Sequence, residues 1–184
     1  MRVGKLRLGA LCALALATAL AGCNRGQPQP ACPGGLIPSD AAKVTRFRDG
    51  PGRDLTDVMV EGQIQDVLVQ CKYNKNIVDI DLQIAVLAAR GPADRTRLAD
   101  FQYFVAIVDP QQNILVKEPF KIRFEFSDNR TQLGKVEEIS PRLPLPDPSK
   151  ADTYRILVGF QLTPDELAWN RSQSQNGNES AKEQ

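Results

Sequence analysis

The sequence contains no histidine, and this absence removes whole classes of catalysis from consideration. Hydrolases of the Ser-His-Asp and Cys-His types need an imidazole as general base. The sequence also has no glycine-rich loop of the kind that binds phosphates. We therefore expect no catalytic residue, no cofactor and no metal ion, in a protein that is not an enzyme.

The chain also lacks an excess of charge of either sign. It has 23 Lys and Arg against 22 Asp and Glu, a formal net charge of +1. Domains that bind nucleic acid carry a basic patch, and surfaces that bind acidic membranes carry basic runs. The even balance predicts no nucleic-acid partner.

No apolar run is long enough to cross a membrane as a helix. The run at residues 8–20 is shorter than the roughly 20 residues that a span needs. It follows Arg2, Lys5 and Arg7 and ends in small residues, which is the layout of a secretory signal peptide. We expect residues 1–22 to be cleaved; a retained anchor helix is the weaker alternative.

The end of that run, Leu20-Ala21-Gly22-Cys23, resembles the lipobox of bacterial lipoproteins. The resemblance implies cleavage before Cys23 and attachment of a diacylglycerol to its thiol. Two or more acyl chains hold a protein stably at a membrane. Asn24 follows instead of Asp, which by the same resemblance favours the outer membrane, facing the periplasm. The alternative is an ordinary cleavage site with Cys23 beside it by chance.

The four cysteines divide by position. Cys12 leaves with the signal peptide and Cys23 carries lipid, so Cys32 and Cys71 remain. Disulfides form and persist in an oxidising compartment, and we expect these two residues to be bonded. Two free thiols, or a metal site completed by carboxylates, are the alternatives.

Composition divides the mature chain into three parts. Residues 23–35 are polar and rich in Pro and Gly, which is typical of a flexible tether. Residues 36–170 contain the apolar segments of a single domain. Residues 171–184 have no apolar anchor, and we expect a disordered polar tail.

The domain shows the period-two alternation of β-strands. The clearest example is residues 78–86, where apolar Val78, Ile80 and Leu82 alternate with Asp79 and Asp81. Residues 58–73 alternate too, but the phase shifts by one residue at 65–66, which predicts a bulge. Further strands are expected at 44–47, 101–108, 114–116, 120–126, 136–139, 143–145 and 154–162.

One helix is expected, directly after the last strand. Thr163-Pro164-Asp165-Glu166 combines an N-cap threonine, a proline in the first turn and a glutamate three residues after the cap, which form a capping box. We expect a short helix that ends near Asn170 and packs against the domain through Leu167 and Trp169.

These elements predict an all-β fold: a single immunoglobulin-like or fibronectin type III-like β-sandwich of seven to eight strands with one short C-terminal helix. Three stretches also resemble an uncharacterised lipoprotein family of proteobacteria. They are Thr45-Arg46-Phe47-Arg48-Asp49-Gly50-Pro51-Gly52-Arg53-Asp54-Leu55-Thr56-Asp57, Tyr103-Phe104-Val105-Ala106-Ile107-Val108-Asp109-Pro110 and Val158-Gly159-Phe160-Gln161-Leu162-Thr163. The resemblance implies a location in the cell envelope and no mechanism.

Three features could carry chemistry, and each has a structural alternative. Asp79 and Asp81 share a strand face and could bind a cation, although a solvated outer face explains them more simply. The segments 46–53 and 90–97 carry arginines that could contact acidic groups, or they are ordinary charged loops. Trp169 could stack on a sugar, or cover the end of the sandwich.

The sequence thus favours a lipid-anchored envelope lipoprotein. We expect it to act as a non-enzymatic module that binds an envelope protein, attached to the membrane through its N-terminal lipid. Sandwich edges accept added strands, which directs attention to residues 44–47 and 136–139. A carboxylate-dependent hydrolase and a small-ligand binder acting on envelope components are the alternatives.

Overall fold

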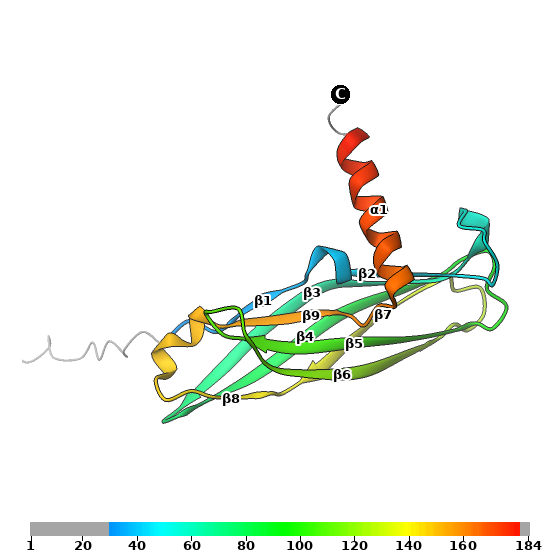
Figure 1. Cartoon of the computed structure of the whole chain (residues 1–184). Coiled ribbons are helices and arrows are strands. Elements are labelled where there is room, and N and C mark those ends of the chain that lie inside the picture. Colours follow the sequence, from blue (N-terminus) through cyan, green and yellow to red (C-terminus); the bar gives the residue numbers. More distant parts are fainter. Residues whose placement is uncertain (1–29, 181–184) are drawn as a thin grey trace, which may run out of the picture.

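A computed structural model describes residues 30–180 of the chain (Figure 1). The predictions for the signal peptide, for lipidation of Cys23 and for most of the tether concern residues 1–29 and lie outside the described residues. Within 30–180, no helix is both long enough and apolar enough to cross a membrane.

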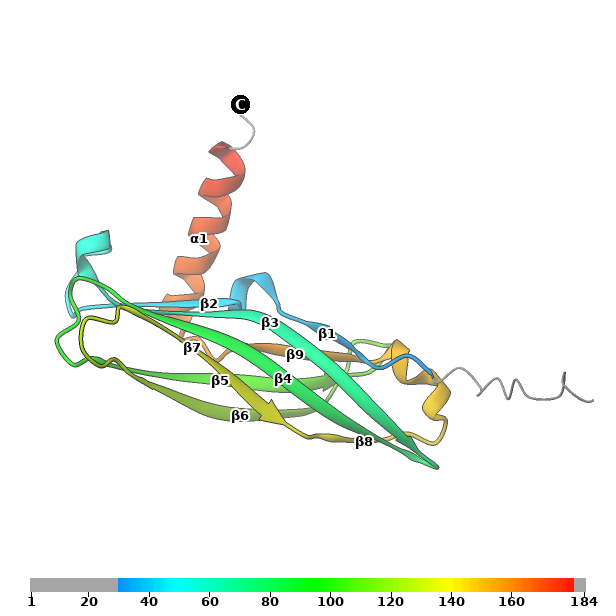
Figure 2. The same ribbon diagram turned by 180° about the vertical axis from the view of Figure 1, so that it is seen from behind.

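In the part of the chain that the structure describes, nine strands form two sheets that pack face to face (Figures 1 and 2). Sheet A contains, in order, β1 (Gly34–Leu36), β9 (Arg155–Phe160), β5 (Leu98–Val108) and β6 (Ile114–Glu125). Sheet B contains, in order, β2 (Lys43–Phe47), β3 (Val58–Asn74), β4 (Ile77–Arg90) and β7 (Gln132–Ile139), with β8 (Arg142–Pro144) beside the start of β4. The helix α1 (Pro164–Ser180) and three 3₁₀ turns, η1 (Ser39–Ala41), η2 (Leu55–Asp57) and η3 (Pro148–Thr153), complete the fold.

The predicted all-β sandwich with a C-terminal helix is confirmed, and its core follows from the alternation. Every second residue of β4 from Val78 to Ala88 is buried, because successive side chains of a strand point to opposite faces. These residues meet the aromatic rings of Phe101, Phe124 and Phe160 from sheet A. The last part of β5, Val105–Val108, is buried on both faces, as expected for a central strand.

The phase shift in β3 is a bulge. Ile64 pairs with Val86 and Asp66 with Ala85, so Gln65 is an extra residue without a partner in β4. Before the bulge Val60 and Ile64 point into the core. After it, the inward residues are Val67, Val69, Cys71 and Tyr73. The bulge therefore keeps both apolar sets of one long strand on the inner face.

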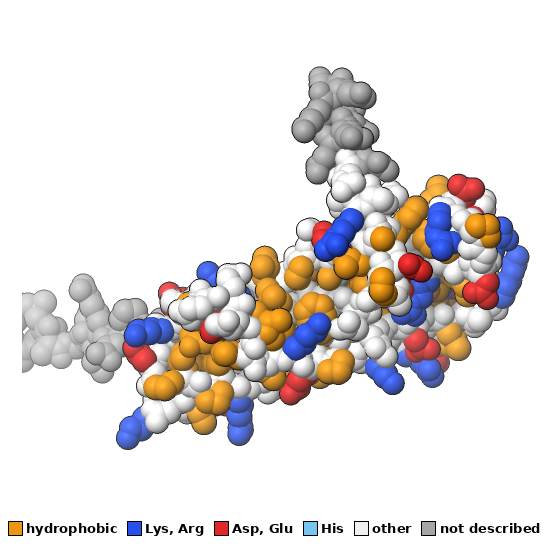
Figure 3. All heavy atoms as spheres, viewed as in Figure 1, with side chains coloured by type: hydrophobic (Ala, Val, Ile, Leu, Met, Phe, Trp, Pro, Cys, Tyr) orange, Lys and Arg blue, Asp and Glu red, His pale blue; other side chains and the backbone are white. Residues whose placement is uncertain are grey.

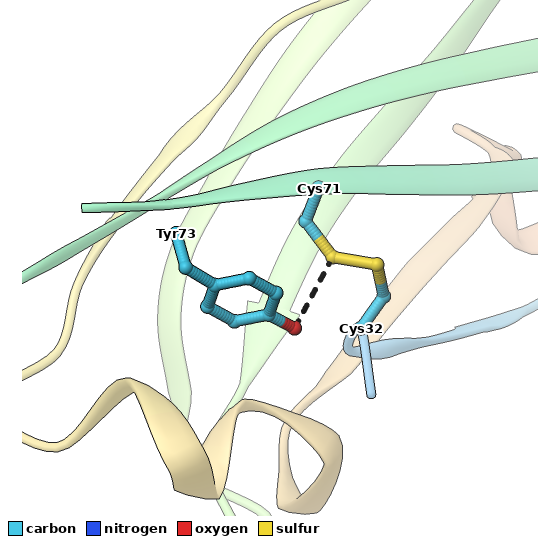
Figure 4. The surroundings of a disulfide bond; sticks show 3 residues. All are labelled: Cys32, Cys71 and Tyr73. Atoms are coloured by element: carbon cyan, nitrogen blue, oxygen red, sulfur yellow. Dashed lines mark hydrogen bonds between the residues drawn. A yellow bond between two sulfur atoms is a disulfide. The ribbon is translucent and has the colours of Figure 1, made fainter. Parts of the chain in front are cut away.

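Cys32 and Cys71 form the expected disulfide, with their Cα atoms 5.9 Å apart. Figure 4 shows that the bond joins the segment before β1 to the inner face of β3, beside the hydroxyl of Tyr73. That hydroxyl lies 3.5 Å from Cys71 Sγ. The disulfide thus fixes the point at which the N-terminal segment enters the sandwich.

The boundary expected for the tether is two residues too late. Gly34 and Gly35 belong to β1, which pairs in parallel with β9 from Arg155 to Leu157. Gly35 packs closely there, because a Cβ would lie 3.1 and 3.0 Å from the side chains of Val67 and Val69 and would force them to shift. Composition indicates a tether, but close packing on β3 makes this segment a strand.

Two strands expected separately, at 114–116 and 120–126, are one strand, β6, which runs through Pro119. β6 is the last strand of sheet A, so it has a neighbour on one side only, β5. Proline is tolerated in such an edge strand because its missing N–H need not face a partner.

The helix is longer than expected. It extends to Ser180, ten residues past Asn170, where the sequence predicts a disordered tail from residue 171. Nucleation is the costly step in helix formation, and each further residue adds one hydrogen bond. The capped and docked first turns therefore support a polar continuation that has no apolar face of its own.

Candidate functional site

A groove lies between α1 and the loop that joins β2 to β3. Both elements stand out from the sandwich on the same side (Figure 1), and Figure 3 shows apolar and basic side chains together where they meet. The groove encloses about 680 Å³. Its walls include Phe47 from β2, Leu55 from the loop and Trp169 from α1, and its floor includes Val58 and Glu61 of β3.

The helix wall is set by Glu166, which serves two structural roles. Its carboxylate accepts a hydrogen bond from the Thr163 amide at 2.7 Å, and the Thr163 hydroxyl accepts one from the Glu166 amide at 3.2 Å. This is the capping box that the sequence predicts. The other carboxylate oxygen accepts a hydrogen bond from Arg46 Nε of β2 at 3.1 Å. The side chain that starts the helix therefore also fixes it to sheet B.

Arg46 continues this connection into sheet A. Its guanidinium donates to the carbonyl of Asp100 and lies 5.4 Å from the ring centroid of Phe101. On the same face, Arg123 donates two hydrogen bonds to the Asp100 carboxylate, at 2.6 and 3.1 Å. These bonds lower the pKa of Asp100. Arg46 thus joins the helix and both sheets.

The next turn of α1 lies along the outer edge of β2. Asn170 donates to the carbonyls of Asp40 and Lys43, at 2.9 and 2.8 Å, and Arg171 pairs with the Asp40 carboxylate at 3.0 Å. Trp169 meets Phe47 edge to face, with ring centroids 5.0 Å apart. Trp169 therefore packs against the sandwich, as the structural alternative predicts, and also lines the groove.

The loop wall is organised around the buried carboxylate of Asp57. Arg48 lies 2.5 Å from one oxygen, and the other accepts a hydrogen bond from the Asp54 amide at 3.2 Å. A Cβ at Gly52 would collide with this carboxylate. Arg53 closes the loop by donating to the Gly50 and Gly52 carbonyls, and it stacks over Phe47 at 5.1 Å. Internal contacts of Asp57, Arg48 and Arg53 therefore hold the loop in this conformation.

The groove has no dominant charge. Lys43 and Arg53 line it together with Asp54 and Glu61. The two carboxylates have structural partners: Asp54 caps η2, and Glu61 accepts a hydrogen bond from the Thr45 hydroxyl at 3.4 Å. Among residues 30–180, no three His, Cys, Asp or Glu side chains cluster as metal ligands would. The groove offers apolar surface with a mixed polar rim.

The other sequence candidates have structural roles. Asp79 pairs with Arg142 and Asp81 with Lys72, both at 3.2 Å, so the two aspartates form part of a solvated outer face. In the loop 90–97, the buried Asp94 accepts hydrogen bonds from Arg90, from the Thr96 amide and hydroxyl, and from the Arg97 amide. Those contacts shape the turn between β4 and β5.

The two predicted docking edges differ in access. α1 packs against β2 and η1, so the backbone edge at residues 44–47 is partly covered. β7 is the other edge of sheet B, and Val136 on it is exposed. The Lys135 ammonium of β7 nevertheless donates to the Arg123 carbonyl of β6, which links the two sheets at that point.

Sequence reasoning singles out Trp169 and the segment 46–53 without bringing them together. It misses Leu55, Asp57 and Asn170. A leucine inside a loop rich in Asp, Arg and Gly is the one signal that could have pointed to the groove. Comparisons with protein-family models, curated proteins and solved structures found no match to this chain.

Proposed function

We propose that the protein is a lipid-anchored, non-enzymatic docking module of the cell envelope, which receives a segment of another envelope protein in the groove between α1 and the β2–β3 loop. The observation that carries the proposal is the groove itself, whose walls are held by the internal contacts of Glu166 and Asn170 in α1 and of Asp57 in the loop. The family resemblance and the anchor at Cys23 remain expectations on which the membrane location rests.

The position of the groove supports this role. Thirteen residues of β3 separate the disulfide at Cys71 from Val58 in the groove floor. At about 3.3 Å per residue, this distance is about 40 Å. Cys23 precedes Cys32 by nine residues, and a tether of this length spans at most about 30 Å. A lipid at Cys23 would hold one end of the sandwich at the membrane and present the groove at the other end.

The chemistry of the groove favours a protein segment as its occupant. Phe47, Leu55 and Trp169 provide apolar contact, and aromatic residues are enriched where proteins bind proteins. The balanced rim charges would repel no segment of either sign, and they offer hydrogen bonds to a peptide backbone. A strongly anionic polymer would instead call for a surplus of cations.

Site-specific photo-cross-linking in intact cells tests the proposal. A photoreactive residue at Leu55, which is 83% exposed in the groove wall, should give one discrete adduct. The same residue at Leu68, an exposed position on β3, is the matched control and should give none. The adduct should disappear in the Trp169→Ala variant. Equal labelling from both positions would count against a docking groove.

The anchor has a separate test. A Cys23→Ser variant should carry no lipid and should stay in the supernatant when membranes are sedimented. A variant that remains membrane-bound would refute the lipobox interpretation.

A small ligand is the second candidate occupant, because about 680 Å³ is within the range of ligand pockets. A ligand that binds the folded state raises the apparent stability. Thermal stabilisation by an envelope glycan or lipid fragment, lost in Trp169→Ala, would favour this alternative over a protein partner.

A further inference from the structure

Three consecutive apolar residues are exposed at the start of β6. Ile114, Leu115 and Val116 are 60, 52 and 40% exposed. All of β6 from Ile114 to Pro119 is exposed on both faces, although alternation would bury every second residue. The register shifts here, with Val108 opposite Ile114 and Ile107 opposite Val116, so Leu115 is an extra residue in a bulge.

The turn before these residues is closed by hydrogen bonds of Asp109. Asp109 accepts hydrogen bonds from the amides of Gln111 and Asn113, at 2.9 and 2.8 Å, and from the Asn113 side chain at 2.9 Å. The Asp109 amide in turn donates to the Asn113 carbonyl at 3.0 Å. The apolar residues therefore follow a closed hairpin turn.

This hairpin lies at the end of the sandwich where the chain enters. Across sheet A, Gly34 is opposite Arg155, Arg155 is opposite Val108, and Val108 is opposite Ile114. Three strand spacings of about 4.8 Å place Ile114 roughly 14 Å from Gly34. The β3–β4 hairpin and η3 lie at the same end (Figure 1). Ile77, at the start of β4, adds another exposed apolar side chain there.

Charges at this end cancel. The elements at this end carry six basic and six acidic side chains. The basic residues are Lys72, Lys75, Lys117, Arg142, Lys150 and Arg155, and the acidic residues are Asp79, Asp81, Asp109, Glu118, Asp147 and Asp152. Three pairs of them are ion pairs, Lys72–Asp81, Arg142–Asp79 and Lys150–Asp147. Figure 3 shows apolar side chains gathered at this end between scattered charges. The end therefore has an apolar surface without an electrostatic preference.

We propose that this end of the sandwich rests on the lipid bilayer, with Ile114, Leu115 and Val116 inserted among the headgroups. The inference rests on the proposed lipid anchor, since the nine residues from Cys23 to Cys32 bring this end within about 30 Å of the membrane. Exposed apolar patches mark binding surfaces, and a tether this short keeps the apolar patch close to the bilayer. The contact would orient the long axis of the sandwich away from the membrane.

Fluorescence quenching by lipid-borne probes tests this orientation. The mature, lipidated chain, which begins at Cys23, is reconstituted into phosphatidylcholine vesicles that contain doxyl-labelled phosphatidylcholine. Its one tryptophan, Trp169, is replaced by Phe, and a reporter is introduced as Leu115→Trp. The matched control is Leu98→Trp, at the opposite end of the sheet on β5, where the native leucine is 43% exposed.

Quenching should be about threefold stronger or more at position 115 than at position 98. Because the charges cancel, it should persist in 0.5 M salt, roughly three times the physiological ionic strength. An Ile114→Trp variant should behave like Leu115→Trp, which guards against a local folding defect at one position.

The possible failures are distinguishable by vesicle flotation. A chain that does not float with vesicles would overturn the anchor and, with it, this inference. A chain that floats, but whose position 115 is quenched no more than position 98, would overturn the inference alone. Blue-shifted fluorescence at position 115 without lipid quenching would mean that a protein, a second copy included, covers this strand.

Discussion

Removal of the Cys32–Cys71 disulfide should lower stability by an amount that the structure defines. The two residues are 39 positions apart. In the chain-entropy model, opening a loop of about 40 residues costs about 4 kcal/mol. For a domain of about 150 residues, 1 kcal/mol corresponds to roughly 2–4 °C in melting temperature. The double variant Cys32→Ala/Cys71→Ala should therefore melt about 8–16 °C below the parent protein.

Local unfolding should increase most in β1. Without the disulfide, this strand is held by three residue pairs with β9, and parallel pairing is slightly weaker per residue than antiparallel pairing. Amide hydrogen exchange in β1 should accelerate far more than in β4. Detachment of β1 would also lengthen the segment between the proposed anchor at Cys23 and the folded domain, which would then extend to η1, where α1 holds Asp40.

Circular dichroism melts and hydrogen exchange by mass spectrometry measure the two effects. Tyr73→Phe is the matched control, because it removes the hydroxyl 3.5 Å from Cys71 Sγ and keeps the disulfide. It should cost less than about 1 kcal/mol. If the double variant also loses less than about 1 kcal/mol, the entropic argument is refuted. If β1 keeps its protection against exchange, the local detachment of this strand is refuted instead.

Three further predictions concern single side chains. Glu166→Ala should lower the free energy of urea unfolding by roughly 2 kcal/mol, because it removes the capping box and the Arg46 ion pair. Glu166→Gln keeps the cap and should lower it by less than about 1 kcal/mol. Equal losses in the two variants would contradict the double role of Glu166. Burial and the nearby charge of Glu137 raise the pKa of Tyr103 to about 12. The folded state thus holds this proton more tightly, so the contribution of Tyr103 to stability should be constant below about pH 10 and fall between about pH 10 and 12, a fall that Tyr103→Phe should reduce. Burial alone would raise the pKa of Asp94, but hydrogen bonds from Arg90 and Thr96 lower it. The ionised Asp94 carboxylate should therefore contribute to stability above about pH 4 and lose that contribution at lower pH. The Asp94→Asn variant should lack this acid dependence and should be about 2 kcal/mol less stable at pH 7.

Local patterns made much of the fold predictable. The alternation in β4, the bulge at Gln65 and the capping box at Thr163 are each encoded within a few residues. Each is present in the structure because the sandwich needs the arrangement that the local pattern favours. The pairing of Cys32 with Cys71 was predicted by counting the cysteines that remain if the N-terminal segment is a signal peptide that directs the chain to an oxidising compartment.

The remaining features depend on contacts between distant residues. β1 is a strand only because β9 pairs with it and Gly35 fits against Val67 and Val69. The groove needs Phe47, Leu55 and Trp169 in one place, and no local pattern connects positions more than a hundred residues apart. Sequence could name two of these side chains as candidates, but only the docking of α1 on β2 brings them together.

The bulge in β3 also determines which changes of length the chain can accept. Because Gln65 has no partner in β4, its deletion would leave Cys71 and Tyr73 facing inward and straighten the strand. Deletion of Leu68, past the bulge, would turn Cys71 to the outer face and separate it from Cys32. The unpaired Gln65 is thus a position at which the chain before Cys71 can lose one residue and keep the disulfide.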